Sequence, residues 1–348
     1  MNKVYVFCPA KIVSGGPEAL HQLVDAINYL SGDAYIVYTR NNLISERKET
    51  TPARYKRYNT PAATGSAIDD SGQNFFVVPE SMPNLLDAVK HGVKCLWWLS
   101  VGFKKEDYDY QGLNDIIHLY QSEHARTFVT VHINPQRIYG LSDYVLIERL
   151  KPVRKEDKIA LVERKLESSL KPIVDHIKTH YKVKVIKGLS RMRLGYLLSK
   201  TKVLFDFGTH PGKDRLPREA ALYDNVILTS SFGASSNQID VPIPAKYKVS
   251  KATTIEEINA LLDHCLSSHE QNLSDFEFYK KGIQKEKHVF FTEVNSVFEL
   301  RNSDDAIKDL TESHQVAGSS FSERLMESTV LLYCRRIIEY IRIKVFNN

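Results

Sequence analysis

Residues 206–228 read DFGTHPGKDRLPREAALYDNVIL. The β-rich run over 202–207 predicts a strand, and a loop rich in Gly and Pro follows it. Pro217 suits the first position of a helix, so we expect a short helix over 217–223. A second strand is predicted over 226–229. This order of strand, loop, helix and strand is one unit of an α/β fold.

Charged side chains crowd the loop and the start of that helix. His210, Lys213, Arg215 and Arg218 all fall within 9 residues of each other. The free N–H groups at a helix N-terminus already favour anions. The stretch therefore predicts a diphosphate site, and Glu219 in the first turn is placed to accept hydrogen bonds from a ribose diol.

The same alternation continues on both sides of this stretch. The second half of the chain predicts further strands over 158–162 and 183–186, with helices over 167–180, 190–199, 255–269 and 275–301. The first half predicts strands over 4–8, 34–38, 75–78 and 94–99, and a helix over 18–30. Alternation of this kind implies parallel sheets covered by helices. Residues 41–72 are polar and rich in Thr, Pro, Arg and Gly, which indicates a mobile excursion.

We therefore predict an α/β fold with two Rossmann-like domains facing each other across a cleft. The first domain takes residues 1–150 and the second takes 151–301, with the basic stretch 149–158 as the linker. Ligands of such sheets bind at the carboxyl ends of the strands. Residues 302–322 are rich in Ser, Asp and Gly and predict a flexible tether to a C-terminal helical extension over 323–348.

Composition excludes some classes of protein. The 348 residues carry a net charge of +5, with 43% hydrophobic and 26% charged residues, as is usual for a globular protein. Lys and Arg do not alternate with stacking aromatic residues as they do in nucleic-acid binders. The chain starts directly with a strand, has no apolar run long enough to span a membrane, and has four widely spaced cysteines. We expect a cytoplasmic protein.

Two motifs resemble a known family. HPGKDRLPREAA at 210–221 and SGGPEALHQL at 14–23 are similar to bacterial capsule and O-antigen glycosyltransferases of the GT-B fold. The resemblance implies transfer of a sugar from a nucleotide-sugar donor to a glycan or lipid-linked glycan acceptor, in surface polysaccharide biosynthesis. It implies no cofactor and no bound metal. In the retaining members a first Glu stands eight residues before the second; here Pro211 takes that place.

The resemblance also assigns residues to the donor. Glu219 matches the Glu that binds the nucleotide ribose, while Arg164 or Lys165 falls where a cation holds the pyrophosphate. Lys187 follows the strand whose end usually contacts the base. With these we group Gly15, Gly16, His210, Gly212 and Arg218 as donor-binding residues. Lys213 and Arg215 are the candidates for stabilising the leaving diphosphate.

Other candidates come from the first half of the chain. Gly15 and Gly16 allow close approach of the backbone to a ligand. His21 is a candidate catalytic base, although a His on a half-buried helix more often has a structural role. Glu18, Glu123 and His124 are candidates for the acceptor side.

Rival functions make different predictions. A GT-A transferase needs a metal-binding Asp-x-Asp, and Asp107 and Asp109 spell that pattern in a polar segment. A non-catalytic module would bind the nucleotide or sugar without turnover. A sugar-nucleotide epimerase would carry G-x-x-G-x-x-G after its first strand, and that spacing is absent here.

The C-terminal stretch has its own pattern. Residues 323–346 combine apolar positions with a cluster of basic residues, as in a helix that docks on the inner face of the plasma membrane. A helix that packs back on the first domain, or one that drives oligomerisation, would show the same pattern.

Overall fold

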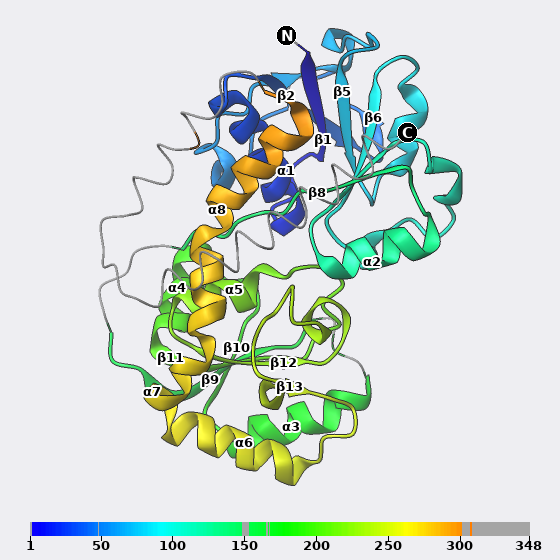
Figure 1. Ribbon diagram of the computed structural model, residues 1–348. Coiled ribbons are helices and arrows are strands. Elements are labelled where there is room, and N and C mark those ends of the chain that lie inside the picture. Colours follow the sequence, from blue (N-terminus) through cyan, green and yellow to red (C-terminus); the bar gives the residue numbers. More distant parts are fainter. Residues whose placement is uncertain are drawn as a thin grey trace. The chain divides into compact units, whose positions relative to one another are not determined.

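The computed structural model describes residues 2–47, 49–147, 153–164, 166, 168–300 and 307. Their strands form two separate sheets, each with helices packed around it (Figure 1). The α/β class predicted from the sequence is confirmed. The predicted tether and C-terminal helix lie outside the described residues.

The first sheet has eight strands, in the order β3-β2-β1-β5-β6-β7-β8 with β4 paired to β2. All its pairs are parallel except that of β2 with β3, which is antiparallel. The strands are β1 Lys3–Pro9, β2 Asp33–Arg40, β3 Leu43–Ile44, β4 Ala62–Ala63, β5 Phe75–Pro79, β6 Val93–Trp98, β7 Ile117–Tyr120 and β8 Arg137–Gly140. The strand order reverses at β1, because β2 lies on one side of it and β5 on the other.

The second sheet has five parallel strands, in the order β10-β9-β11-β12-β13. They are β9 Glu156–Val162, β10 Val183–Val185, β11 Thr201–Asp206, β12 Val226–Ser230 and β13 Lys248–Val249. Its order reverses at β9. In open parallel sheets the carboxyl ends of the strands at such a reversal form the binding crevice.

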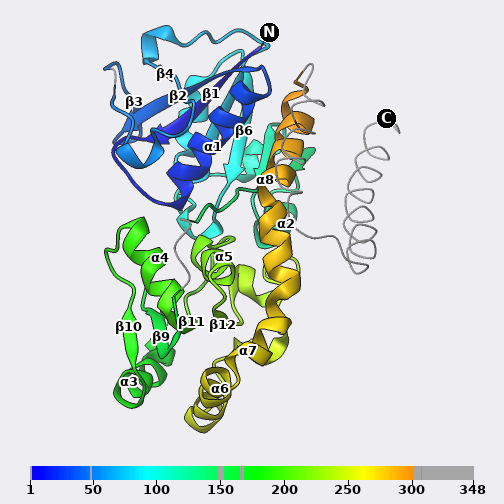
Figure 2. The same ribbon diagram turned by 90° about the vertical axis from the view of Figure 1, so that its left-hand side faces the viewer.

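The helices are α1 Gly15–Tyr29, α2 Glu123–His132, α3 Lys171–His180, α4 Arg191–Lys200, α5 Arg215–Leu222, α6 Ile255–Ser267, α7 His269–Asn272 and α8 Glu277–Phe298. Several start where local chemistry predicts. Ser190 caps α4, and Thr254 with Glu257 forms a capping box on α6. The long α8 contacts both α5 and α1, so it joins the two halves (Figure 2).

Each sheet has its own apolar core. One cluster gathers residues such as Phe7, Phe76 and Trp98 around the first sheet. Another gathers residues such as Leu161, Phe205 and Tyr247 around the second. Burial of this area supplies most of the favourable free energy of folding within each half.

A buried ionic network joins the halves. Arg218 on α5 is fully buried, and its guanidinium contacts Asp143 Oδ1 at 2.7 Å and Glu286 Oε2 on α8 at 2.9 Å. Backbone oxygens of Asp143, Lys213 and Asp214 accept its other hydrogen bonds, so all five N–H groups of Arg218 are used. Arg218 thus ties together α5, α8 and the segment that leaves β8.

No helix in the described ranges is long and apolar enough to cross a membrane. The predicted linker is described only from residue 153 onward, and β9 begins at Glu156 rather than at the predicted 158.

We predict that Arg218→Met lowers the free energy of unfolding by about 3–5 kcal/mol, because it removes a fully buried cation from two buried carboxylates and leaves Asp143 only Arg215 and Glu286 only Lys213. Urea denaturation measures this change. Arg126→Met is the control, since the Arg126–Glu123 pair lies at the surface and its loss costs less than about 1 kcal/mol. Equal midpoints for the two variants would contradict a joining role for Arg218.

Candidate functional site

The turn after β1 is held by a tyrosine. The hydroxyl of Tyr55 accepts a hydrogen bond from Ser14 N and donates one to Ser14 O, both at 2.9 Å. Tyr55 is fully buried, although it belongs to the excursion that the sequence predicts to be mobile. A Cβ on Gly15 would lie 3.0 Å from Cδ of Arg215, so this turn also receives a side chain from the second half.

Four arginines surround Glu18 in the first turn of α1. Glu18 is 0% exposed. Arg54 and Arg57 reach it from the first half, with Arg54 Nη2 at 3.0 Å from Oε2. Arg191 Nη1 and Arg215 Nη2 reach its Oε1 from the second half, at 3.5 and 3.7 Å. We call Arg54, Arg57, Arg191 and Arg215 the arginine cluster.

The cluster keeps Glu18 ionised. Burial by itself would raise the pKa of the Glu18 carboxyl, but Arg215 and the other three arginines outweigh it and lower the pKa. The hydroxyl of Tyr58 donates a further hydrogen bond to Oε1 at 3.0 Å. A buried carboxylate therefore fixes cations from three separate segments, residues 53–58, α4 and α5, around one point.

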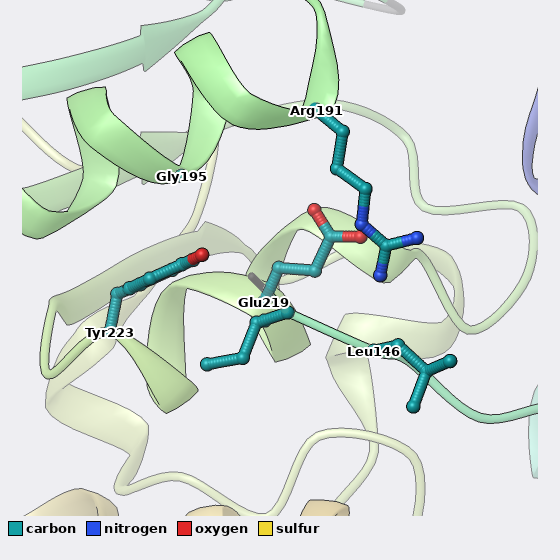
Figure 3. Close-up of a pocket in the computed structure, with 6 residues that line it drawn as sticks. Leu146, Arg191, Gly195, Glu219 and Tyr223 are labelled. Atoms are coloured by element: carbon teal, nitrogen blue, oxygen red, sulfur yellow. The ribbon is translucent and has the colours of Figure 1, made fainter. Parts of the chain in front are cut away.

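Glu219 borders the same cluster. Its Oε1 lies 3.9 Å from Arg215 Nε, and it lines a small cavity with Arg191, Gly195 and Tyr223. Figure 3 shows the Arg191 guanidinium and the Glu219 carboxylate side by side between α4 and α5. Burial raises the pKa of Glu219 in spite of Arg215 and Arg191. The cavity volume of about 10 Å³ is enough for one water.

The loop before α5 packs against the first half of the chain. A Cβ on Gly212 would lie 2.4 Å from Leu99 O, so only glycine fits there. The N–H of Lys213 donates to Gln121 Oε1 at 3.1 Å, while its Nζ pairs with Glu286 at 2.9 Å. Gly212 therefore allows close approach to protein backbone, and Lys213 holds a neighbouring carboxylate.

His210 and Arg218 differ from the sequence prediction of anion-binding groups. His210 is buried with a φ of 41°, and its ring nitrogens face Asp214 Oδ2 and the carbonyl of Asp206. Burial would lower the His210 pKa, but Asp206 and Asp214 raise it, so these carboxylates take up its charge. Arg218 has no N–H group left for a phosphate. Both residues organise the loop instead.

His21 is also corrected. It is fully buried, with Nδ1–H donating to Pro17 O at 2.6 Å and Nε2 accepting from the Tyr38 hydroxyl at 2.9 Å. Burial lowers the His21 pKa, which favours the neutral ring. With both nitrogens bonded, His21 is not available as a base. It positions Tyr38 and stacks on Tyr55 with ring centroids 4.4 Å apart.

Glu123 and His124 lie at the start of α2. Their backbone N–H groups donate to the two carboxylate oxygens of Asp240 in the second half, at 2.7 and 3.0 Å. The Glu123 side chain pairs with Arg126. Asp240 thus caps a helix of the opposite half, and these two residues lie at the junction between the halves.

The remaining predicted residues lie apart from the cluster contacts. Gly16 sits beside Leu99 in the turn after β1. Arg164 and Lys187 are exposed near the ends of β9 and β10. Lys165 lies outside the described residues.

Asp109 Oδ1 accepts from the N–H groups of Gln111 and Gly112, as in a local turn. In the described ranges no group of three or more His, Cys, Asp or Glu is arranged to hold a metal ion.

Sequence reasoning missed Arg54, Arg57, Arg191, Asp143 and Asp240. Arg54 and Arg57 stand three apart in ARYKRY at 53–58, a short run of basic residues beside tyrosines that the composition argument overlooked. That spacing would have indicated two cations on one face of a turn. The other three sit in ordinary polar surroundings that carry no local signal.

We expect Glu18→Gln to lower the free energy of unfolding by about 2 kcal/mol near neutral pH. This is less than for a fully buried pair because Arg54 and Arg57 are one-third exposed. A lowered pKa stabilises above the ordinary carboxyl value of about 4.3, and that contribution is lost as the pH falls through the folded pKa. The difference from wild type, measured by urea unfolding, should therefore shrink as the pH falls below the ordinary carboxyl value. Glu256→Gln, at an exposed position on α6, is the control. A difference independent of pH would mean that Glu18 is not ionised.

No model of a known protein family and no curated protein sequence matches this chain. Solved structures do match. A sucrose-phosphate synthase from Thermosynechococcus elongatus aligns over 86% of this chain and 98% of its own, with a TM-score of 0.61 and 7% identity. WaaG, a glycosyltransferase involved in lipopolysaccharide biosynthesis, aligns over 86% and 100%, with a TM-score of 0.54 and 10% identity.

S. aureus TarM, solved in complex with Fondaparinux, alpha-GlcNAc-glycerol and UDP, aligns over 67% of this chain with a TM-score of 0.50 and 14% identity. The alignment covers 57% of TarM, so this chain spans little more than half of that protein. The matched structures are GT-B glycosyltransferases, and likeness at such low identity establishes the fold. This chain has the GT-B fold, as the two motifs at 14–23 and 210–221 predict.

Proposed function

We propose that this chain is a glycosyltransferase that moves a sugar from a nucleotide-sugar donor to a glycan or lipid-linked glycan acceptor. The arginine cluster is the observation that carries the proposal. Arg191 and Arg215 are the first residues of α4 and α5, and Glu18 lies in the first turn of α1. Three helix N-termini therefore meet where four guanidinium groups meet, and both features select anions.

The charges suit a diphosphate. The four arginines of the cluster contact three carboxylates, those of Glu18, Glu219 and Asp143, and the charge of Asp143 is balanced by Arg218. The excess is two positive charges, and the diphosphate of a nucleotide sugar carries about two negative charges. Guanidinium groups also match phosphate oxygens in shape, because they offer pairs of parallel N–H donors. Buried Nε and Nη2 of Arg215 form no hydrogen bond with the described residues, so these donors are open to a phosphate.

Each residue has a distinct role in the proposal. Arg191 and Arg215 hold the diphosphate from the second half of the chain, and Glu219 accepts hydrogen bonds from the ribose hydroxyls. When the sugar leaves through an oxocarbenium-like transition state, negative charge grows on the nucleoside diphosphate. The preorganised arginines and helix ends stabilise that charge. Lys213 adds a further positive charge nearby, screened by its pairing with Glu286.

The matched structures support the choice of substrate. TarM is solved with UDP and a GlcNAc-glycerol, and WaaG acts in lipopolysaccharide biosynthesis. On this basis we propose a glycan of a surface polysaccharide as acceptor. Contact of residues 323–346 with a membrane stays a prediction, because that segment lies outside the described residues.

Substitutions in the donor site separate the two roles. We expect Glu219→Ala to weaken binding of both nucleoside and nucleoside diphosphate, by about 10- to 100-fold, because a charged hydrogen bond contributes about 1.5–3 kcal/mol. Arg215→Met should weaken the nucleoside diphosphate alone. Calorimetry with the best ligand from a UDP, GDP, dTDP and CMP screen measures both, with Glu256→Ala as control.

Unchanged binding in both variants would place the nucleotide elsewhere. Binding without any hydrolysis of the matching nucleotide sugar, with or without acceptor, would indicate a non-catalytic module.

We further propose that turnover needs no divalent metal, because arginines and helix N-termini neutralise the leaving group. Activity should therefore persist in EDTA. Loss of activity in EDTA with recovery in Mn²⁺ or Mg²⁺, abolished by Asp107→Asn and Asp109→Asn, would instead support metal-assisted chemistry.

A further inference from the structure

A second cavity lies away from the arginine cluster. It has a volume of about 320 Å³, within the range of ligand pockets. Every residue that lines it belongs to the first half of the chain: Pro9, Ala10, Ile12, Thr39, Arg40, Asn41, Asn42 and Met82. These residues follow or end β1 and β2. The cavity therefore occupies the carboxyl edge of the first sheet, where parallel sheets bind ligands.

Two adjacent amides define its polar side. Asn41 and Asn42 form the two-residue loop of the β2–β3 hairpin, in which Arg40 pairs with Leu43. Their φ angles of 50° and 58° fit a tight turn that favours Asn or Gly. Glycine would serve the backbone equally well, so the turn itself does not require the amides. Neither amide has a hydrogen-bond partner in the part of the chain that the structure describes.

The hairpin is held in place. The guanidinium of Arg40 pairs with both carboxylate oxygens of Glu49, with Nη2 at 2.8 Å from Oε2. Thr39 donates from its hydroxyl to Cys8 O and contacts the sulfur of Met82 at 3.3 Å. The amides therefore belong to a fixed frame, and the lining of the same cavity includes the apolar residues Met82, Ile12 and Pro9.

This combination has the chemistry of a carbohydrate site. Each amide offers two donors and an acceptor, a set that matches neighbouring sugar hydroxyls. Apolar side chains in the same lining suit the C–H face of a sugar ring. A charged ligand is disfavoured, because Glu49 already neutralises Arg40.

The cavity lies close to the arginine cluster along the chain. Ile12 lines the cavity, and Gly15 contacts Arg215. Three residues of extended chain reach about 11 Å at most. A sugar in the cavity is therefore within the length of a short oligosaccharide from the proposed diphosphate site.

We propose that this cavity is a glycan subsite, in which Asn41 and Asn42 bind a sugar unit of the acceptor. The proposal rests on the proposed function for the identity of its occupant as acceptor. It is separate from Glu123 and His124, the acceptor-side residues predicted from the sequence, whose backbone N–H groups are bound by Asp240.

The test removes the amides and keeps the turn. In Asn41→Gly/Asn42→Gly the backbone retains its positive φ angles, so the hairpin persists. Asn134→Gly is the matched control, because Asn134 is exposed, has a φ of 52° and lies outside the cavity. Saturation-transfer NMR of the full chain, with maltose, lactose, cellobiose and diacetylchitobiose as probes, measures saccharide binding. Nucleotide binding is measured on the same samples.

We expect at least one disaccharide to bind the wild type with a millimolar Kd. The double variant should weaken that binding about tenfold or more, because it loses two hydrogen-bonding groups. Its nucleotide affinity and thermal midpoint should match those of wild type and Asn134→Gly.

Two results would overturn the subsite: no disaccharide binds the wild type at about 50 mM, or the double variant binds as well as the wild type. Neither result bears on the proposed function, which the nucleotide-binding measurement tests by itself. Saccharide binding without nucleotide binding would keep the subsite and reject the proposed function.

Discussion

The structure around the candidate site depends on one buried charge, the carboxylate of Glu18. A carboxylate removed from water is costly unless cations and hydrogen-bond donors surround it. Here the cations come from the 53–57 segment, α4 and α5, so each of these must keep its place for Glu18 to remain stable. The arginines, in turn, repel one another, and the negative charge of Glu18 offsets that repulsion. The Glu18 carboxylate therefore holds the arginines in the arrangement that we propose binds the anionic diphosphate.

The two halves meet through polar contacts and through apolar packing of α8, whose Phe290 and Phe291 contact Tyr144 and Tyr29 of the first half. Arg218 pairs with Asp143, Asp240 caps α2, and Gln121 bonds the loop before α5. Water can replace each of these polar contacts when the halves separate. Separation of an apolar contact instead exposes apolar surface to water, which costs free energy. Polar junctions of this kind are usual where domains move relative to each other. A cluster that takes cations from both halves is complete only when the halves are together.

The sequence predicted the fold well because hydrophobic periodicity and turn chemistry act locally. The strand predicted over 202–207 is β11 Thr201–Asp206, and the helix predicted to start at Pro217 is α5, which starts two residues earlier at Arg215. The site was predicted less completely because charge pairing is long-range. Arg218 and Arg215 look alike in the sequence, and burial against Asp143 and Glu286 makes only one of them structural. Arg54 and Arg57 lie in a segment that the sequence predicts to be mobile. In the structure the Tyr55 hydroxyl bonds the backbone of Ser14 and fixes that segment.

The two motifs behind the family resemblance, SGGPEALHQL and HPGKDRLPREAA, lie about 200 residues apart in the chain, yet they form one structural unit. Gly15 of the first motif makes room for Arg215 of the second, and Gly212 of the second lies against the backbone of Leu99. A larger side chain at Gly212 would force the loop away from the backbone of Leu99, whereas one at Gly15 would displace the side chain of Arg215. Arg215 then reaches Glu18, which belongs to the first motif. The glycines and the charged side chains therefore have the same effect, because both bring the N-termini of α1 and α5 close together.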